Sequence, residues 1–136
     1  MAAQVGISTL LDWASGLFAG RDLGRRGEKL AARELRRRGY EILERRWRCR
    51  LGEIDLVARQ GEVLVVVEVK ARSREDYGLP IDAVDRAKRR KLSKLARAYL
   101  KAKNLRDTNV RFDLVGVTFT GGKRPRVDVF PDALRF

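Results

Sequence analysis

Two short hydrophobic segments on either side of Gly61 constrain the fold of this chain more than any other feature. The first reads Gly-Glu-Ile-Asp-Leu-Val over residues 52–57. The second, over residues 63–70, is a run of valines and a leucine that ends in Glu-Val-Lys. β-Branched runs bounded by glycine favour strands. The pattern therefore predicts two strands joined by a tight turn, with two acids and a lysine at fixed positions on them.

Strand geometry should gather the acids of the first segment. Because successive side chains of a strand point to opposite faces, Glu53 and Asp55 should share one face. Ile54 and Leu56 should share the other face. The alternation predicts one acidic and one apolar face for this strand.

The second segment should bring its own acid next to Asp55. Asp55 precedes Gly61 by 6 residues (61 − 55) and Glu68 follows it by 7 (68 − 61), so pairing about this turn makes them near neighbours. Glu68 and Lys70 share a face of the second strand. Two adjacent carboxylates repel each other unless a cation lies between them. The carbonyl of Val69 can supply a further oxygen ligand, so the segment predicts a metal site.

A divalent ion at this position would support hydrolysis of a phosphodiester. It would polarise the phosphate and lower the pKa of a bound water. Lys70 could orient or deprotonate that water, or stabilise the developing charge. The alternative is a surface ion pair worth less than about 1 kcal/mol. However, the segment before Glu68 is too apolar for an exposed edge, so we expect Glu68 to be partly buried and to need a partner.

The charge of the chain indicates a polyanionic partner. Its 136 residues are enough for one domain with a buried core, and they carry a net charge of +13 with a pI near 10.8. Nucleic acid is the commonest partner of such a surface. Two alternatives remain: the charge only aids solubility, or it serves an anionic membrane, which would also require an amphipathic anchor.

The residue types that are missing narrow the chemistry. The chain has no histidine, which excludes Ser-His-Asp and Cys-His catalysis, histidine ligands and a histidine base. A metal must then be bound by carboxylates and carbonyls, which suit Mg²⁺ or Mn²⁺. Cys49 is the single cysteine, so no intramolecular disulfide can form. Together with the lack of a membrane-spanning run or a secretory signal, this predicts a cytoplasmic protein.

The chain divides near residue 22. Residues 1–22 form an extension in which residues 7–18 carry apolar side chains at helical spacing. Gly20–Gly24 is the expected joint to a domain over residues 23–136. The apolar face of residues 7–18 should pack on this domain or on a second copy of the chain in a homodimer. A membrane-surface helix is the alternative, but this stretch has no Lys or Arg on its polar face.

The domain should alternate helices and strands. Residues 24–38 predict a helix whose apolar stripe is Gly27, Ala31 and Leu35, and Glu28 beside the stripe can point toward the sheet. The order α-β-β-β-α-β-β predicts an α/β sandwich around one mixed sheet. The further elements expected are strands at about residues 40–48, 52–57, 62–70, 110–119 and 126–130, and a helix over residues 82–103 with Asp82 as its cap.

Lys88 should project from the buried face of the long helix. It follows Val84 by four residues and precedes Leu92 by four, so it lies in the centre of the apolar stripe. One interpretation is a lysine that covers apolar surface with its stem and keeps its amine in water. The other is that Lys88 reaches the carboxylate site or a bound phosphate.

Basic residues surround the two motif strands. Trp47 lies in a basic segment and could stack on an unpaired base, with a core or interface position as the alternative. No element is typical of sequence-specific groove reading, so recognition of backbone or shape is favoured. Phosphate contacts are expected from six arginines: Arg45, Arg46, Arg48, Arg50, Arg72 and Arg74.

The chain resembles the YraN-like family of the PD-(D/E)xK nuclease superfamily, which is related to archaeal-type Holliday-junction resolvases. The resemblance covers Gly24 to about Val117. One departure is Ile54, which stands where the superfamily motif has proline. The residues that carry the resemblance are Gly27-Glu28, the two strand motifs, the helix with Lys88, and Arg111-Phe112-Asp113.

The resemblance implies a restriction endonuclease-like fold, which is a three-layer sandwich with a central mixed β-sheet. It implies that Asp55 and Glu68 bind Mg²⁺ or Mn²⁺ and that Lys70 is catalytic. Glu28 would complete the acidic cluster from the first helix. Lys88 matches a helix position that often carries a polar or basic residue.

These patterns predict a Mg²⁺-dependent endonuclease that acts on DNA, with branched or damaged DNA as the expected substrate and no membrane partner. The alternative is a catalytically inactive nucleic-acid-binding or assembly protein on the same fold. A third interpretation is an RNA-processing partner. The presence of Asp55, Glu68 and Lys70 together argues against the inactive alternative, because a protein without catalytic activity has little need of all three.

Overall fold

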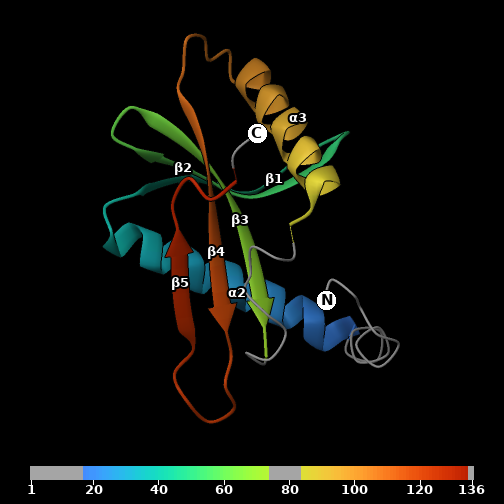
Figure 1. The fold of residues 1–136 in the computed structure, drawn as a ribbon, viewed down its shortest axis with the longest axis vertical. Helices are drawn as coiled ribbons and strands as arrows, with labels where there is room; N and C mark the ends of the chain where they lie inside the picture. Colours follow the sequence, from blue (N-terminus) through green and yellow to red (C-terminus); the bar gives the residue numbers. More distant parts are fainter. Residues whose placement is uncertain (1–16, 74–83, 135–136) are drawn as a thin grey trace.

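The computed structural model describes residues 17–73 and 84–134, and their side chains from residue 23 onward. Neither helix in these ranges is long and apolar enough to cross a bilayer. Most of the helix expected over residues 7–18 lies outside the described residues, so its apolar face and the homodimer contact stay predictions. The elements are α2 (Leu17–Arg37), β1 (Glu41–Cys49), β2 (Gly52–Gln60), β3 (Val63–Arg72), α3 (Arg86–Ala102), β4 (Val110–Thr118) and β5 (Arg126–Phe130) (Figure 1).

The helices begin at positions that differ from the expected ones. Helix α2 begins at Leu17 and continues through Gly20–Gly24, where the glycines predict a joint; the domain boundary at residue 22 stays a prediction. Helix α3 begins at Arg86 rather than residue 82. Its N-cap is Asp85, which has an extended backbone. The Asp85 carboxylate accepts a hydrogen bond from the N–H of Lys88 at 2.8 Å. The predicted cap, Asp82, lies outside the described residues.

The five strands form one mixed sheet in the order β1-β2-β3-β4-β5. Neighbouring strands are antiparallel except β3 and β4, which are parallel and are connected through α3. Helix α2 covers one face of the sheet and α3 covers the other (Figure 1). The protein is therefore an α/β three-layer sandwich with the restriction endonuclease-like element order, as predicted.

Strand β3 lies at the centre of the sheet and contributes to a core on each face. Val65 and Val67 pack in the cluster under α2, whereas Leu64 and Val66 pack in the cluster under α3. All four side chains are buried. Burial on both faces explains why the sequence of this strand is a continuous apolar run rather than an alternation.

Strand β2 changes face at Asp55. Ile54 packs in the cluster under α3 and Leu56 in the cluster under α2, so the expectation that they share a face is wrong. The pairing of β2 with β3 runs only as far as Leu56 and Val67. Beyond that pair, the Asp55 carboxylate accepts a hydrogen bond from the N–H of Val69 at 2.8 Å. Because β2 leaves the ladder here, the alternation of its side chains is not maintained.

A buried ionic network ties the start of β1 to β4. The carboxylate of Asp113 is completely buried and accepts hydrogen bonds from the Tyr40 hydroxyl at 2.7 Å, from Arg111 Nε at 2.8 Å and from the N–H of Asp132 at 2.8 Å. Burial and the bond to Asp113 raise the pKa of Tyr40 to about 12, so this hydroxyl remains a donor. The network gives the Arg111-Phe112-Asp113 segment a structural role.

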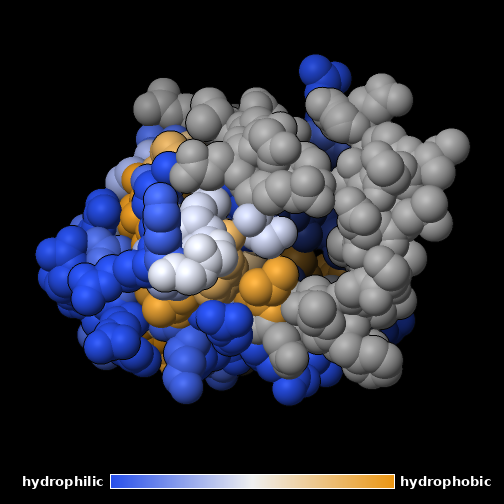
Figure 2. Space-filling model, turned by 90° about the horizontal axis from the view of Figure 1, so that it is seen from below, coloured by the Kyte–Doolittle hydropathy of each residue, from blue (hydrophilic) through white to orange (hydrophobic). Residues whose placement is uncertain are grey.

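Figure 2 views the end of the molecule where β3 and β4 terminate and the β4–β5 turn lies. An apolar area is visible in the middle of this end, and hydrophilic side chains border it. The cluster under α2 includes half-buried residues close to this end, Ala71 on β3 and Val127 on β5. Of the acidic residues discussed below, Glu68 lies on β3, and Glu28, Glu53 and Asp55 lie on α2 and β2.

At Gly27 the backbone of α2 lies directly against β3. A Cβ atom added to Gly27 would lie 2.8 Å from the Cβ of Ala71, well inside the contact distance of two carbon atoms. Ala31 and Leu35, one and two turns further along α2, are completely buried, which confirms the predicted apolar stripe. The close contact at Gly27 brings the next residue, Glu28, to the sheet.

We expect Gly27→Ala to lower the free energy of unfolding by about 1–3 kcal/mol, because the added methyl group overpacks the contact with Ala71. Gly24→Ala is the matched control in the same helix. No atom lies within 4 Å of a Cβ added there, so alanine should raise the free energy by roughly 0.5–1 kcal/mol through helix propensity. Urea unfolding of both variants measures the change in the free energy of unfolding. A similar change in both variants would contradict close packing at Gly27.

Candidate metal centre

Three carboxylates from two elements converge beside the sheet. Glu28 of α2 and Glu53 and Asp55 of β2 each place one oxygen within 4.8 Å of the other two. Oxygen ligands of one divalent ion lie roughly 3–5 Å apart, so this donor set can hold such an ion. Glu53 was not among the predicted ligands, although its position two residues before Asp55 on a strand was the signal that could have identified it.

Asp55 and Glu68 are neighbours, as the hairpin spacing predicts. Burial and the negative charge of Glu68 raise the pKa of Asp55 well above its usual value of 3.8, and the hydrogen bond from the Val69 N–H opposes this rise only in part. At Val69, the group in contact with Asp55 is thus the backbone N–H. Ligation by the Val69 carbonyl stays a prediction.

Glu68 is buried and lies between two lysines. Its Oε2 atom lies 3.1 Å from Nζ of Lys88 and 3.4 Å from Nζ of Lys70, and the residue is only 3% exposed. A buried carboxylate requires such partners. Of the two interpretations of Lys88, the structure therefore shows contact with the carboxylate site. The catalytic roles of Lys70 and Lys88 stay predictions.

Two of the arginines expected to contact phosphate lie against the acidic cluster, and their contact with phosphate stays a prediction. Arg46 Nε lies 2.6 Å from Glu28 Oε1, and Arg48 Nε lies 2.6 Å from Glu53 Oε2. The side chain of Arg48 is nevertheless 74% exposed. A cavity of about 420 Å³ contains both acids and both guanidinium groups in its walls. Its lining residues are Gly24, Arg25, Glu28, Arg46, Arg48 and Glu53.

Arg46 adopts a backbone conformation that is unusual within a strand. Its φ angle is +54°, in the left-handed region that costs a non-glycine residue about 1–3 kcal/mol. Arg45 pairs with Leu56 and Trp47 pairs with Ile54, so Arg46 lies opposite Asp55. Strand β1 is thus irregular at the same level at which β2 changes face.

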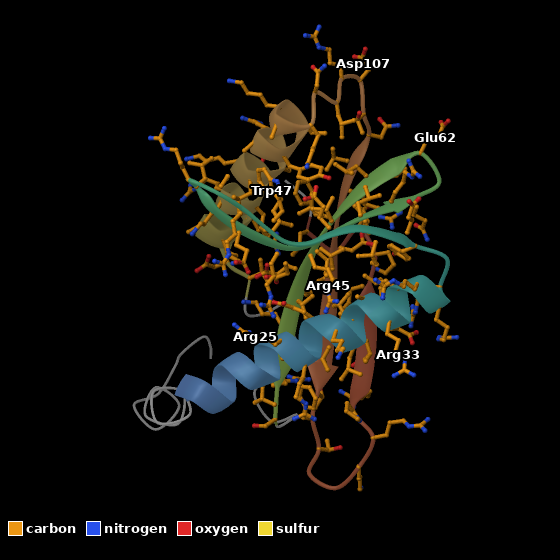
Figure 3. The ribbon with its side chains drawn as sticks, turned by 180° about the vertical axis from the view of Figure 1, so that it is seen from behind. Arg25, Arg33, Arg45, Trp47, Glu62 and Asp107 are labelled. Atoms are coloured by element: carbon orange, nitrogen blue, oxygen red, sulfur yellow. The ribbon has the colours of Figure 1, made fainter. Side chains whose placement is uncertain are left out.

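Trp47 packs against α3 rather than standing free. Its ring meets the ring of Tyr99 edge to face, with centroids 5.2 Å apart, and it belongs to the half-buried border of the α3-side core (Figure 3). Of the two alternatives for Trp47, the structure shows the core position. Base stacking by Trp47 would require this contact to open.

The other predicted phosphate contacts lie in different places. Arg45 and Arg50 are exposed, and Figure 3 shows Arg45 between the β1–β2 hairpin and α2. Arg72 is half-buried at the end of β3 and donates a hydrogen bond to Thr118 Oγ1 at 3.2 Å. Arg74 lies outside the described residues. The structure therefore gathers Arg45, Arg46, Arg48 and Arg50 along one strand and its turn.

Residues 27–117 match the sequence model of a family described as "Uncharacterised protein family UPF0102". The chain belongs to this family. A UPF0102 protein from Geobacter sulfurreducens is 47% identical over 111 residues, which cover 82% of this chain and 87% of the relative. One from Clavibacter michiganensis subsp. michiganensis is 49% identical over 113 residues, which cover 83% and 96%. Similarity to these relatives shows the family, and a chemical function has to come from the residues of the site.

We expect Asp55→Asn to raise the free energy of unfolding at neutral pH, by roughly 1 kcal/mol, a usual size for one substitution. The amide oxygen can keep the bond from Val69, while repulsion with Glu68 disappears. Since the folded pKa of Asp55 lies above 3.8, the folded state binds more protons at this site, and the contribution of Asp55 to stability should fall as pH rises above about 4. The gain from Asp55→Asn should therefore grow as pH rises from about 4 in thermal unfolding.

The control for this measurement is Glu62→Gln, at the exposed β2–β3 turn away from the cluster (Figure 3). It should change stability little at any pH. Mg²⁺ or Mn²⁺ should raise the midpoint of wild-type unfolding and of the control, and raise that of Asp55→Asn less. A destabilised Asp55→Asn protein would show that the carboxylate is not under repulsion.

Proposed function

We propose that this protein is a Mg²⁺- or Mn²⁺-dependent endonuclease that hydrolyses phosphodiester bonds in DNA, with branched or damaged DNA as the expected substrate. One observation supports this most directly. Glu28, Glu53 and Asp55 converge beside Glu68 and its two lysines, on a chain with a net charge of +13. A cluster of acids on a strongly basic protein can bind a metal ion, while the surrounding positive charge attracts the phosphates of a nucleic acid.

The donor set fits a hard divalent cation. The three side chains that lie together, Glu28, Glu53 and Asp55, are all carboxylates, and the chain has no histidine to favour a softer metal. Burial and the negative charge of Glu68 raise the pKa of Asp55, and a cation beside Asp55 would favour its charged form. When bound, such an ion would polarise the phosphate and lower the pKa of a water molecule. Glu28, Glu53 and Asp55 would hold it, and ligation by Glu68, the neighbour of Asp55, stays a prediction.

Lys70 is the side chain best suited to assist the reaction. Its amine lies 3.4 Å from Glu68 Oε2, and about a third of the side chain is exposed, so it can reach a substrate without losing its partner. Hydrolysis joins the oxygen of water to phosphorus and breaks one P–O ester bond, and the proton from water ends on the departing oxygen. A charged Lys70 would donate hydrogen bonds to the oxygens on which negative charge develops.

One observation favours the inactive alternative. Arg46 and Arg48 form ion pairs with Glu28 and Glu53, so two of the three clustered acids already have cationic partners. A nucleic-acid-binding or assembly protein could use the same pairs only to hold α2 against the β1–β2 hairpin. Cleavage assays separate the two functions.

We expect metal-dependent cleavage of DNA that falls at least about a hundredfold in Asp55→Asn, with DNA binding retained. The assay compares linear, single-stranded, flapped and four-way-junction DNA in Mg²⁺, Mn²⁺ or EDTA. Glu62→Gln should cleave like the wild type. Cleavage that survives Asp55→Asn would show that the site is wrong. Tight binding without cleavage of any form would favour the inactive alternative, and preferential cleavage of matched RNA would favour the RNA-processing one.

Binding should depend steeply on salt, because basic side chains displace counterions from DNA. We expect Arg50→Ala to lower the slope of log affinity against log salt concentration by about one, since Arg50 is exposed at the β1–β2 turn. Arg59→Ala is the matched control, because Arg59 is paired with Glu41 at the opposite end of the hairpin. Fluorescence anisotropy with a short duplex measures both slopes. Equal salt slopes for Arg50→Ala and the wild type would show that Arg50 does not contact DNA phosphates.

A further inference from the structure

Leu51 is an apolar side chain at the turn between β1 and β2. Among the residues whose side chains the structure describes, only Leu51 and Leu105 are large, apolar and exposed, at 51% and 38%. The turn that carries Leu51 projects past α3, away from the body of the sheet (Figures 1 and 3). The core therefore does not account for this leucine.

The surroundings of Leu51 are strongly basic. Arg50 precedes it in the turn and is exposed. Lys91 of α3 lies over the next residue, since a Cβ added to Gly52 would lie 3.0 Å from Lys91 Cε. Lys94 follows on the same helix and is exposed. We call this surface the basic tip, and its residues are Arg48, Arg50, Leu51, Lys91 and Lys94.

We propose that Leu51 is a wedge that enters an interrupted base stack of DNA while the cations of the basic tip hold the flanking phosphates. Apolar side chains such as leucine are inserted between base steps by proteins whose neighbouring residues contact the backbone. A membrane is a poorer partner for the same surface, because stable attachment needs a broad apolar helix face rather than one side chain. The inference rests on the proposed function for the choice of DNA as partner.

The position of Leu51 suits a duplex that also reaches the acidic cluster. Leu51 precedes Asp55 by four residues on an extended strand, which places them roughly 13 Å apart. This separation corresponds to about four base steps along one strand of DNA. Arg48 links the two regions, because it belongs to the basic tip and pairs with Glu53 of the cluster.

The energetics of insertion select the form of DNA. Burying one leucine returns no more free energy than unstacking one intact base step costs. Insertion by Leu51 alone therefore gives no net gain on an intact duplex. At a nick one strand is no longer continuous, so the base step opens at lower cost than in an intact duplex, and burial of Leu51 there adds to affinity. The basic tip would thus bind interrupted DNA more tightly than intact DNA.

The test uses the full chain in EDTA, where binding is measured without cleavage. The probes are an intact duplex and the same duplex with one nick, carrying 2-aminopurine at the nick or at one to five steps from it. We expect wild-type protein to raise 2-aminopurine fluorescence several-fold at the nick and to bind nicked DNA about tenfold more tightly than intact DNA. Leu51→Ala should lose both effects.

Three further variants separate the wedge from the charge. Leu51→Met should retain the fluorescence rise, because it keeps the apolar length. Leu51→Lys should bind the intact duplex as tightly as the wild type or more tightly, without the fluorescence rise and without the preference for the nick. Leu105→Ala should behave as wild type, although Leu105 is also exposed and near basic residues, Lys103 and Arg106.

The outcomes that overturn this inference differ from those that overturn the nuclease. A flat fluorescence signal from DNA-bound wild type, or a rise that persists in Leu51→Ala, would refute the wedge even if metal-dependent cleavage is found. A rise that depends on Leu51 in a protein that never cleaves would refute the nuclease and support the wedge. Binding to anionic vesicles that depends on Leu51, with no response from DNA, would assign the basic tip to a membrane surface.

Discussion

Repulsion between Asp55 and Glu68 is the constraint around which this site is built. Strand β3 is buried on both faces, so the carboxylate of Glu68 at its end is shielded from water and needs other partners. Lys70 of the same strand and Lys88 in the first turn of α3 supply these partners. Helix α3 thus carries a charge partner for the sheet as well as an apolar face. The cap at Asp85 fixes where that helix begins and so where Lys88 lies.

The backbone near this pair is irregular in a way that serves the carboxylates. On β2 the ladder to β3 ends at Leu56, and the Asp55 side chain takes the N–H of Val69 in place of a backbone carbonyl. A hydrogen bond to the charged form partly offsets burial and repulsion. On the other side of β2, Arg46 is held at positive φ opposite Asp55. Regular strand pairing would have kept the Asp55 side chain away from the N–H of Val69. Both strands therefore depart from regular geometry where the charged side chains lie together.

Most of the fold followed from sequence periodicity. The run of valines in β3, the stripe of Gly27, Ala31 and Leu35, and the spacing of Lys88 within α3 are local patterns with one low-energy arrangement. The close neighbours Asp55 and Glu68 followed from counting residues about Gly61. The change of face at Asp55 did not, because alternation assumes an uninterrupted ladder. The periodicity of one strand does not indicate where its pairing with the neighbouring strand ends.

The ion pairs of Arg46 and Arg48 could not be predicted for a different reason. A basic segment before an acidic strand suggests contacts with a partner, but it does not say which cations are used within the protein. Pairing with Glu28 depends on how closely α2 approaches the sheet, which is set by the absence of a side chain at Gly27. Trp47 is similar, since its position against Tyr99 is fixed by the packing of α3. These contacts are tertiary and lie far apart in sequence.

Charge balance connects the acidic cluster to the basic surface around it. Four carboxylates, from Glu28, Glu53, Asp55 and Glu68, are matched by four cations, from Arg46, Arg48, Lys70 and Lys88. A divalent ion among the first three would leave positive charge in excess. The two arginines are the cations with the most to gain by turning toward phosphate, since Arg48 is already mostly exposed. Metal binding would release the guanidinium groups of Arg46 and Arg48 from the acids, and these groups could then contact DNA phosphates. Metal and DNA would therefore each favour binding of the other.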